Sequence, residues 1–186
     1  MELPYLTPKE VKHLIDSITD TEQKTAIQLG FSLGCRVGEI NKIPNTSNVS
    51  TLIDVLDSKA DGKSDSNRSP YRQCLITTAT LNQIKTFQNY LNDIKDNRKF
   101  LFPYDPKTFN RWIKHWCDVA GITREKKRLI RWHMVRHTYI QNAINMKVPL
   151  KQVSQQTGDS IFTLFKYYEN YTPEQRQEMA EATSVI

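Results

Sequence analysis

The sequence predicts one α+β domain, mainly α-helical, with a small antiparallel β-sheet formed by a hairpin. Most of the chain places apolar residues at helical spacing behind capping residues, and two short segments alternate as strands do. The length of 186 residues and the 38% hydrophobic content suit one domain with a real core. We therefore expect residues 1–186 to form a single domain.

The N-terminal part predicts three helices. Residues 7–10 (TPKE) supply an N-cap, a proline in the first turn and a capping-box acid for the first of them. A second helix is expected over residues 21–33, closed by Gly34. A third begins near Val37 and stops before Pro44.

Two segments predict the hairpin. Residues 51–57 (TLIDVLD) and 71–77 (YRQCLIT) are β-branched and alternating, as expected of strands with one buried face. The polar stretch between them contains glycine and proline, which is typical of a long hairpin loop.

The second half of the chain predicts helices only. One begins at Thr80 (TLNQ, another capping box), and the next begins after Asp105 and ends at Gly121. The remaining helices are expected around residues 134–143, from Pro149 to Gly158, over 160–171 and over 172–182.

Composition excludes several classes of protein. No apolar run approaches the roughly 20 residues of a membrane span, and the first twelve residues do not form a signal peptide. The three cysteines (Cys35, Cys74 and Cys117) are far apart and form no CxxC pair, which argues against a disulfide framework or a zinc ribbon. We expect a soluble intracellular protein, in the cytoplasm or nucleoid of its host cell, with no membrane partner.

The charge is concentrated in one segment. Residues 95–151 hold 14 lysines and arginines against four acidic residues, a net charge of +10, whereas the residues that follow carry −3. Trp112, Trp116, Trp132 and Tyr139 are interleaved with these cations, and this pattern favours a nucleic-acid partner. A solvated basic face with buried aromatic anchors would give the same pattern, and charge alone leaves both interpretations open.

Four local features could carry chemistry. They are Arg36 within GCRVGEI, Lys59 at the mouth of the hairpin, the sequence HMVRHT at residues 133–138, and Gly158-Asp159-Ser160 followed by two tyrosines. Taken separately, each of these features is weak evidence for a function. Their order and spacing across essentially the whole chain resemble the tyrosine recombinase (phage integrase) family of site-specific recombinases.

The resemblance implies a helical tyrosine recombinase catalytic domain that recombines DNA, as integrases of mobile genetic elements do. It implies double-stranded DNA as the partner and self-association on DNA as a tetramer, with the acidic segment 172–182 a candidate contact between protomers. Packing of that segment on its own domain is the alternative. The family normally carries an N-terminal core-binding domain, and we expect that domain to be absent from this chain.

The resemblance also assigns residues. It implies Arg36, Lys59, His133, Arg136 and Tyr168 as the catalytic set, with Glu39 and Asp159 in supporting or uncertain roles. The family usually places its nucleophile nine residues beyond the His or Trp that follows the glycine, and counting from Asp159 reaches Tyr168. An alignment on Ser160 would favour Tyr167 instead.

The chemistry of phosphodiester transesterification suits this set. Two arginines can grip the non-bridging oxygens of a phosphorane, and His133 can act as acid or base near neutral pH. Lys59 could protonate the leaving 5′-oxygen. Because a 3′-phosphotyrosine conserves the bond energy, neither a metal nor a nucleotide cofactor is required.

Asp159 departs from the family pattern, since the family has His or Trp there. A carboxylate beside the scissile phosphate would repel it. Three hypotheses remain open: Asp159 is an N-cap for the following helix, which we favour, or it is protonated in the site, or another residue supplies the lost hydrogen bond.

Three alternative functions are open. Asp159 would suit a relative that binds DNA without cutting it, and a type IB topoisomerase-like strand passer would share the same chemistry. A metalloenzyme using His133 and His137 is disfavoured, because no Glu follows His133 and no third ligand is evident.

Overall fold

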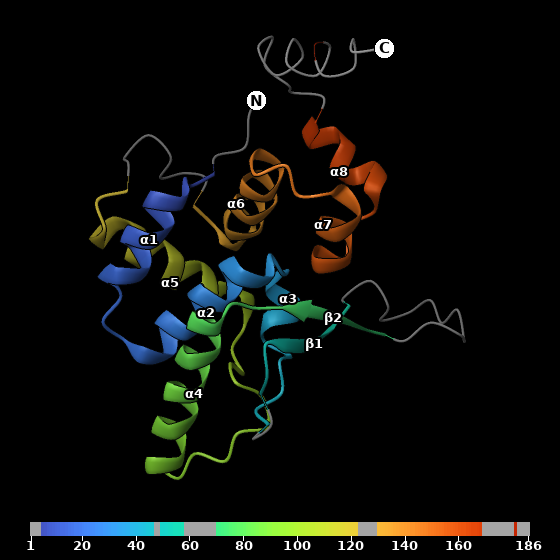
Figure 1. The fold of residues 1–186 in the computed structure, drawn as a ribbon. Helices are drawn as coiled ribbons and strands as arrows, with labels where there is room; N and C mark the ends of the chain where they lie inside the picture. The colour runs from blue at the N-terminus through green and yellow to red at the C-terminus, as the bar shows by residue number, and fades with distance from the viewer. Residues whose placement is uncertain (1–4, 47–48, 58–69, 123–129, 169–180, 182–186) are drawn as a thin grey trace.

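The computed structural model describes residues 5–46, 49–57, 70–122, 130–168 and 181. In these residues the chain forms eight helices and a two-stranded sheet, which confirms the predicted mainly helical α+β class (Figure 1). None of the helices found there is long and apolar enough to cross a membrane.

The N-terminal helices begin and end as their capping residues predict. Helix α1 (Pro8–Ser17) has a reciprocal capping box, in which the Thr7 N–H donates to Glu10 Oε2 at 2.7 Å. Helix α2 (Thr21–Leu33) ends at Gly34, whose φ of 57° is left-handed. Helix α3 (Val37–Ile40) is a single turn.

The hairpin is antiparallel, as expected. Strand β1 (Leu52–Leu56) pairs with β2 (Tyr71–Leu75) so that Val55 lies opposite Arg72. The connecting loop, with Lys59, lies outside the described residues. The side-chain amide of Gln156 binds the outer edge of β2, accepting from the Leu75 N–H at 3.0 Å and donating to the Leu75 carbonyl at 2.7 Å.

Helix α4 (Thr78–Asp93) begins earlier than predicted, and the assignment of Thr80 as its cap is wrong. The cap is Thr77, whose hydroxyl accepts from the Thr80 N–H at 3.2 Å. Thr80 is buried, and its hydroxyl lies 2.7 Å from that of Ser32 on α2. The threonine therefore joins two helices.

The remaining helices match the sequence pattern. They are α5 (Pro106–Val119), α6 (Trp132–Asn145), α7 (Leu150–Thr157) and α8 (Ile161–Tyr168). Asp105 caps α5 as predicted, but Gly121 is not its C-cap: the helix ends at Val119 with Ala120 as the C-cap, and Gly121 follows in a left-handed conformation. The predicted helix over 172–182 lies, apart from Glu181, outside the described residues.

The core explains the aromatic residues of the basic segment. Trp132 is 2% exposed and meets Phe109 edge-on with 5.2 Å between ring centroids, while Trp116 is buried and donates from Nε1 to Gln23. For these two tryptophans the buried-anchor interpretation is correct. A second apolar cluster, which includes Val153 and Leu164, joins α6, α7 and α8.

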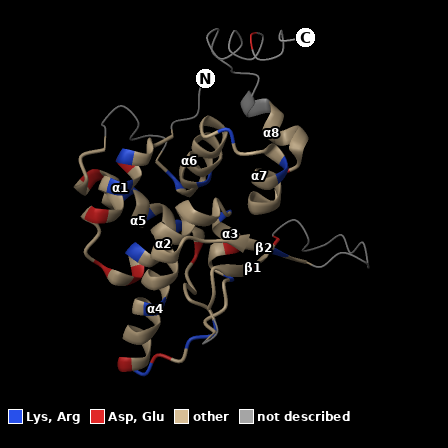
Figure 2. Cartoon of the chain, in the orientation of Figure 1, with Lys and Arg blue, Asp and Glu red and all other residues tan. Residues whose placement is uncertain are grey.

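Acidic and basic residues are mixed along α1 and the start of α2, as the colours in Figure 2 show. The acidic residues are Glu10, Asp16, Asp20 and Glu22, and the basic residues are Lys9, Lys12 and Lys24. In Figure 1, α1 lies across the molecule from α7, α8 and the hairpin.

Candidate active site

Arg36 is held at the start of α3 by a tight turn. Gly34 has a left-handed backbone, and a Cβ at Gly34 would lie 2.5 Å from the ring of Tyr139. Only glycine meets both conditions without strain. The turn leaves the Arg36 side chain 23% exposed.

Arg136 approaches the same turn from α6. Its side chain is 4% exposed, and Nη1 donates to the carbonyl oxygen of Gly34 at 2.7 Å. The backbone of Gly34 thus connects two arginines that are 100 positions apart in the sequence. We call Arg36 and Arg136 the arginine pair.

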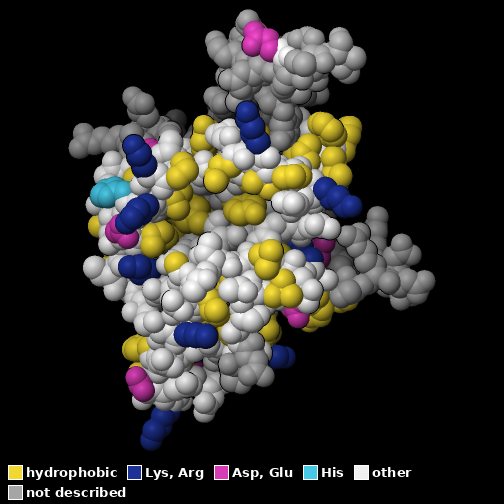
Figure 3. Space-filling view, in the orientation of Figure 1, with side chains coloured by type: hydrophobic (Ala, Val, Ile, Leu, Met, Phe, Trp, Pro, Cys, Tyr) yellow, Lys and Arg dark blue, Asp and Glu magenta, His cyan; other side chains and the backbone are white. Residues whose placement is uncertain are grey.

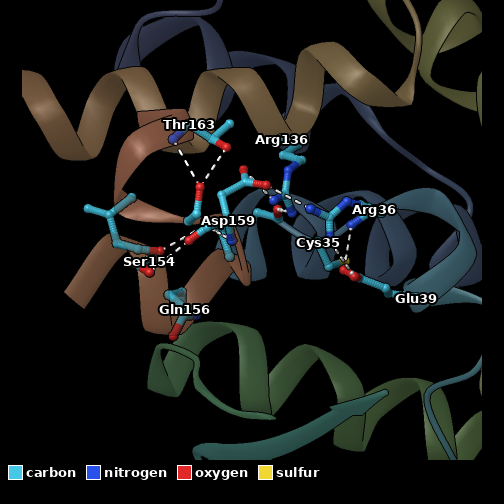
Figure 4. Close-up of polar contacts among 12 residues, drawn as sticks. Cys35, Arg36, Glu39, Arg136, Ser154, Gln156, Asp159 and Thr163 are labelled. Carbon is cyan, nitrogen blue, oxygen red and sulfur yellow. Dashed lines mark hydrogen bonds and ion pairs between the residues drawn. The ribbon is translucent and has the colours of Figure 1, made fainter. Parts of the chain in front are cut away.

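The carboxylate of Asp159 bridges the arginine pair (Figure 4). Its Oδ1 accepts from Arg36 Nη2 at 2.7 Å, and its Oδ2 lies 2.5 Å from Arg136 Nη2. The second contact is an ion pair that lacks the alignment of a hydrogen bond. Two guanidinium groups therefore converge on one anion, with one carboxylate oxygen for each.

The prediction that Asp159 caps α8 is wrong. The cap is Ser160, whose Oγ accepts from the Thr163 N–H at 3.1 Å. The backbone of Asp159 is fixed instead by Ser154, whose hydroxyl donates to its carbonyl, and by Thr157, whose hydroxyl accepts its N–H. These bonds leave the carboxylate to face the arginine pair.

Glu39 binds Arg36, one member of the arginine pair. It accepts hydrogen bonds from the backbone N–H of Arg36 at 2.8 Å and from Arg36 Nη1 at 2.9 Å. Its side chain is fully buried. Burial would raise the pKa of Glu39, but the hydrogen bonds and charge of Arg72, together with Arg36, lower it to about 2.

Arg72 is a member of this site that the sequence analysis missed. It donates from both terminal nitrogens to Glu39, at 3.2 and 2.8 Å. A local signal does exist: Arg72 precedes the buried Cys74 by two positions, so both lie on the same face of β2. A charge on the buried face of a strand requires a partner.

The two histidines of the HxxRH sequence differ. His133 is exposed on the first turn of α6, three residues before Arg136. His137 is 4% exposed and meets the ring of Tyr5 edge-on. In the described part of the chain no group of three or more His, Cys, Asp or Glu residues could hold a metal ion.

For Lys59 and the two tyrosines, the structure gives only the position of neighbouring residues relative to the site. Lys59 is two residues beyond Asp57, whose carboxylate lies 3.9 Å from Arg36 Nη1. Tyr168 is the last residue of α8, preceded by Tyr167, and α8 begins directly after Ser160. The structure thus brings together Arg36, Glu39, Arg136 and Asp159, while Lys59 lies outside the described residues.

Comparison with known proteins identifies the family of the chain and solved structures with the same fold. The phage integrase family model matches residues 4–174. No curated protein matches the chain. Among solved structures, XerA recombinase superposes with a TM-score of 0.75 at 20% identity, covering 100% of this chain and 67% of that one.

Two further structures contain DNA. XerH site-specific recombinase, in a post-cleavage complex with palindromic difH substrate, has a TM-score of 0.72 at 18% identity, covering 99% of this chain and 54% of that one. The Tn1549 transposon integrase, in complex with circular intermediate DNA, has a TM-score of 0.74 at 16% identity, covering 99% and 68%. At these identities the likeness shows a shared fold, and the chain spans about half to two thirds of these proteins.

Proposed function

Because the chain belongs to the phage integrase family, we propose that it is a site-specific DNA recombinase that cuts and rejoins strands through a covalent 3′-phosphotyrosine. The structures of XerH and of the Tn1549 integrase with DNA support double-stranded DNA as its partner.

One observation carries the proposal: Arg36 and Arg136 converge on a single carboxylate. A carboxylate and a phosphodiester each offer two oxygens to a pair of guanidinium groups. Each arginine contacts one oxygen of Asp159, and the same arrangement suits the two non-bridging oxygens of a scissile phosphate. These oxygens gain charge in the transition state, where fixed cations stabilise them most.

The proposed step is a transesterification. The phenolic oxygen of Tyr168 attacks phosphorus and forms a new O–P bond, and the bond from phosphorus to the 5′-oxygen breaks. The leaving oxygen takes a proton and becomes a 5′-hydroxyl. Rejoining reverses these events with a 5′-hydroxyl as the attacking group, so the bond energy is retained without metal or nucleotide.

The hairpin supports Lys59 as the donor of that proton. Lys59 follows two residues after Asp57 in the sequence, and the carboxylate of Asp57 lies 3.9 Å from Arg36 Nη1. His133, exposed on the same helix as Arg136, is the proposed group that exchanges the proton of the tyrosine.

We assign the nucleophile to Tyr168 by the family spacing, with Tyr167 as the alternative. Both belong to α8, which starts two residues after Asp159. Substituting each tyrosine separately decides between them.

Self-association on DNA is part of the proposal. Side chains on α8 leave apolar surface exposed, with Phe162 75% and Phe165 53% exposed (Figure 3). Exposed aromatic residues next to the C-terminal segment are suited to a contact between protomers of a tetramer.

A second candidate function is DNA binding without cleavage. The observation that favours it is the ion pair of Asp159 with both arginines, because a bound carboxylate competes with phosphate for the same nitrogens. In that case DNA would bind and no covalent product would form.

The deciding experiment is a suicide-substrate assay over a library of nicked duplexes, without added metal. We expect an SDS-stable protein–DNA adduct with a free 5′-hydroxyl, lost in Tyr168→Phe and kept in Tyr167→Phe. The reverse pattern would move the nucleophile to Tyr167. Binding without an adduct in the parent chain would favour the non-cleaving candidate.

A further inference from the structure

Arg72 connects three separate parts of the site. Its two terminal nitrogens donate to Glu39, and its Nε donates to the carbonyl oxygen of Gln156 at 3.1 Å. A Cβ at Gly158 would lie 3.1 Å from Arg72 Nη1, so the guanidinium also contacts the turn before Asp159. One side chain on β2 therefore touches α3 and the end of α7.

Glu39 is shared between two arginines. Each oxygen of Glu39 accepts one hydrogen bond from Arg72 and one from Arg36. Arg36 donates from Nη1 to Oε1 and from its backbone N–H to Oε2. Arg36 therefore meets Glu39 with one terminal nitrogen rather than two. Its other terminal nitrogen, Nη2, is left to bind Asp159.

This division of contacts matters because a free arginine–carboxylate pair prefers two parallel hydrogen bonds. Without Arg72, the Glu39 carboxylate could rotate and engage both terminal nitrogens of Arg36. Nη2 would then turn from Asp159, and from any phosphate in its place. The low pKa of Glu39, about 2, keeps the carboxylate available at working pH.

We propose that Arg72 is a positioning residue for the arginine pair, which acts on Arg36 through Glu39 and on Asp159 through the carbonyl of Gln156. The proposal rests on the proposed function in one respect, that the arginine pair binds the scissile phosphate. Arg72 belongs to β2, the strand that follows the loop carrying Lys59 in the sequence, so it connects that part of the chain to Arg36.

The test compares Arg72→Met and Arg72→Lys with a matched control, Arg98→Met. Arg98 resembles Arg72 in burial, with 16% against 12% of its side chain exposed, and it also binds carboxylates, those of Glu22 and Asp96. The first readout needs no activity: the side-chain N–H signals of Arg36 in NMR spectra of each full chain, assigned through Arg36→Lys.

We expect the Arg36 side-chain signals to shift and broaden in Arg72→Met and to stay unchanged in Arg98→Met. Unchanged Arg36 signals in Arg72→Met would overturn the inference, whether or not the chain cuts DNA. Absence of an adduct in the parent chain would count against the proposed function alone, since the NMR result stands by itself.

The second readout is single-turnover cleavage with DNA affinity measured in parallel. A lost orienting partner typically reduces activity about 10- to 100-fold, and we expect Arg72→Met to lose that much rate with affinity within about threefold of the parent. Arg72→Lys keeps the positive charge but cannot donate two parallel hydrogen bonds to Glu39, so it should recover little of the rate. Full recovery by Arg72→Lys would show that charge suffices and would overturn the positioning role.

Discussion

Arg36 Nη2 and Asp159 Oδ1 lie 2.7 Å apart, so the more exposed arginine of the pair is already bound to an anion of the same chain. Any DNA phosphate that reaches the pair must displace this carboxylate or share the arginines with it. The contact therefore stabilises the free protein and opposes phosphate binding.

Asp159→Asn should separate these two effects. The substitution keeps the shape but removes the negative charge beside a guanidinium that is 4% exposed, and removal of one partner from a fully buried pair costs about 3–5 kcal/mol. Because Arg36 is 23% exposed and keeps Glu39 as a partner, we expect a smaller loss of unfolding free energy, together with tighter DNA binding. Urea unfolding and a binding titration on the same protein measure both; weaker DNA binding would contradict the interpretation.

Glu39 should make the domain sensitive to acid. Its pKa is about 2 in the folded protein against an ordinary value of 4.5, so its contribution is complete above pH 4.5 and disappears as the pH falls towards 2. The difference corresponds to about 3 kcal/mol. Glu39→Gln should therefore lose less stability than the parent chain over that interval in urea unfolding. Parallel pH profiles for the two proteins would show that Glu39 does not carry the acid sensitivity.

Gly30→Ala should strain the contact between α2 and α6. The added Cβ would lie 2.4 Å from Cζ2 of Trp132, whose Nε1 donates to the carbonyl of Cys35 beside Arg36. Overpacking of this kind costs about 1–3 kcal/mol, measurable by urea unfolding with tryptophan fluorescence. Gly38→Ala is the matched control, because nothing lies within 4 Å of its added Cβ. Equal stability of the two variants would argue against close packing at Gly30.

The three thiols should be inert in the folded protein. Cys35, Cys74 and Cys117 are buried, and burial raises the pKa of Cys35 and of Cys117 to about 12. We expect a thiol reagent to label none of them at neutral pH until urea unfolds the chain, and then all three. Rapid labelling of one thiol under native conditions would reveal local opening near that residue.

DNA binding should depend steeply on salt, because basic side chains release counterions from phosphates. Replacing Lys126, Lys127 and Arg128 with glutamine should reduce the slope of log affinity against log salt by about 2.7 if each contacts one phosphate. These three positions lie outside the described residues. Lys9→Gln, on α1 across the molecule from α7, α8 and the hairpin (Figure 1), should leave the slope unchanged. An unchanged slope in the triple variant would place the DNA elsewhere.

Much of the fold can be predicted from local patterns, because caps and periodicity are local. The capping box of Thr7 and Glu10 and the glycine that ends α2 lie where the sequence indicates. Thr80 shows the limit of that reasoning. It satisfies the pattern of a cap, but its hydroxyl bonds to Ser32, 48 positions away, and Thr77 caps the helix instead.

The site shows the same limit. The sequence motif singled out Arg36 and Arg136, and the structure brings them to one turn. The sequence motif could not show that Asp159 binds both arginines, because an aspartate just before an apolar helix is equally typical of a helix cap. For Arg72 the local pattern shows only that it shares a strand face with the buried Cys74; its partner, Glu39, is 33 positions away and could not be identified.

The amide of Gln156 has a consequence beyond holding α7 against the hairpin. By accepting from the N–H of Leu75 and donating to its carbonyl, it occupies backbone groups that a neighbouring strand would use. A two-stranded sheet with an open edge is a template on which other chains can add strands and aggregate. A single side chain therefore shields the edge of β2 against such intermolecular pairing, at the point where the hairpin meets α7.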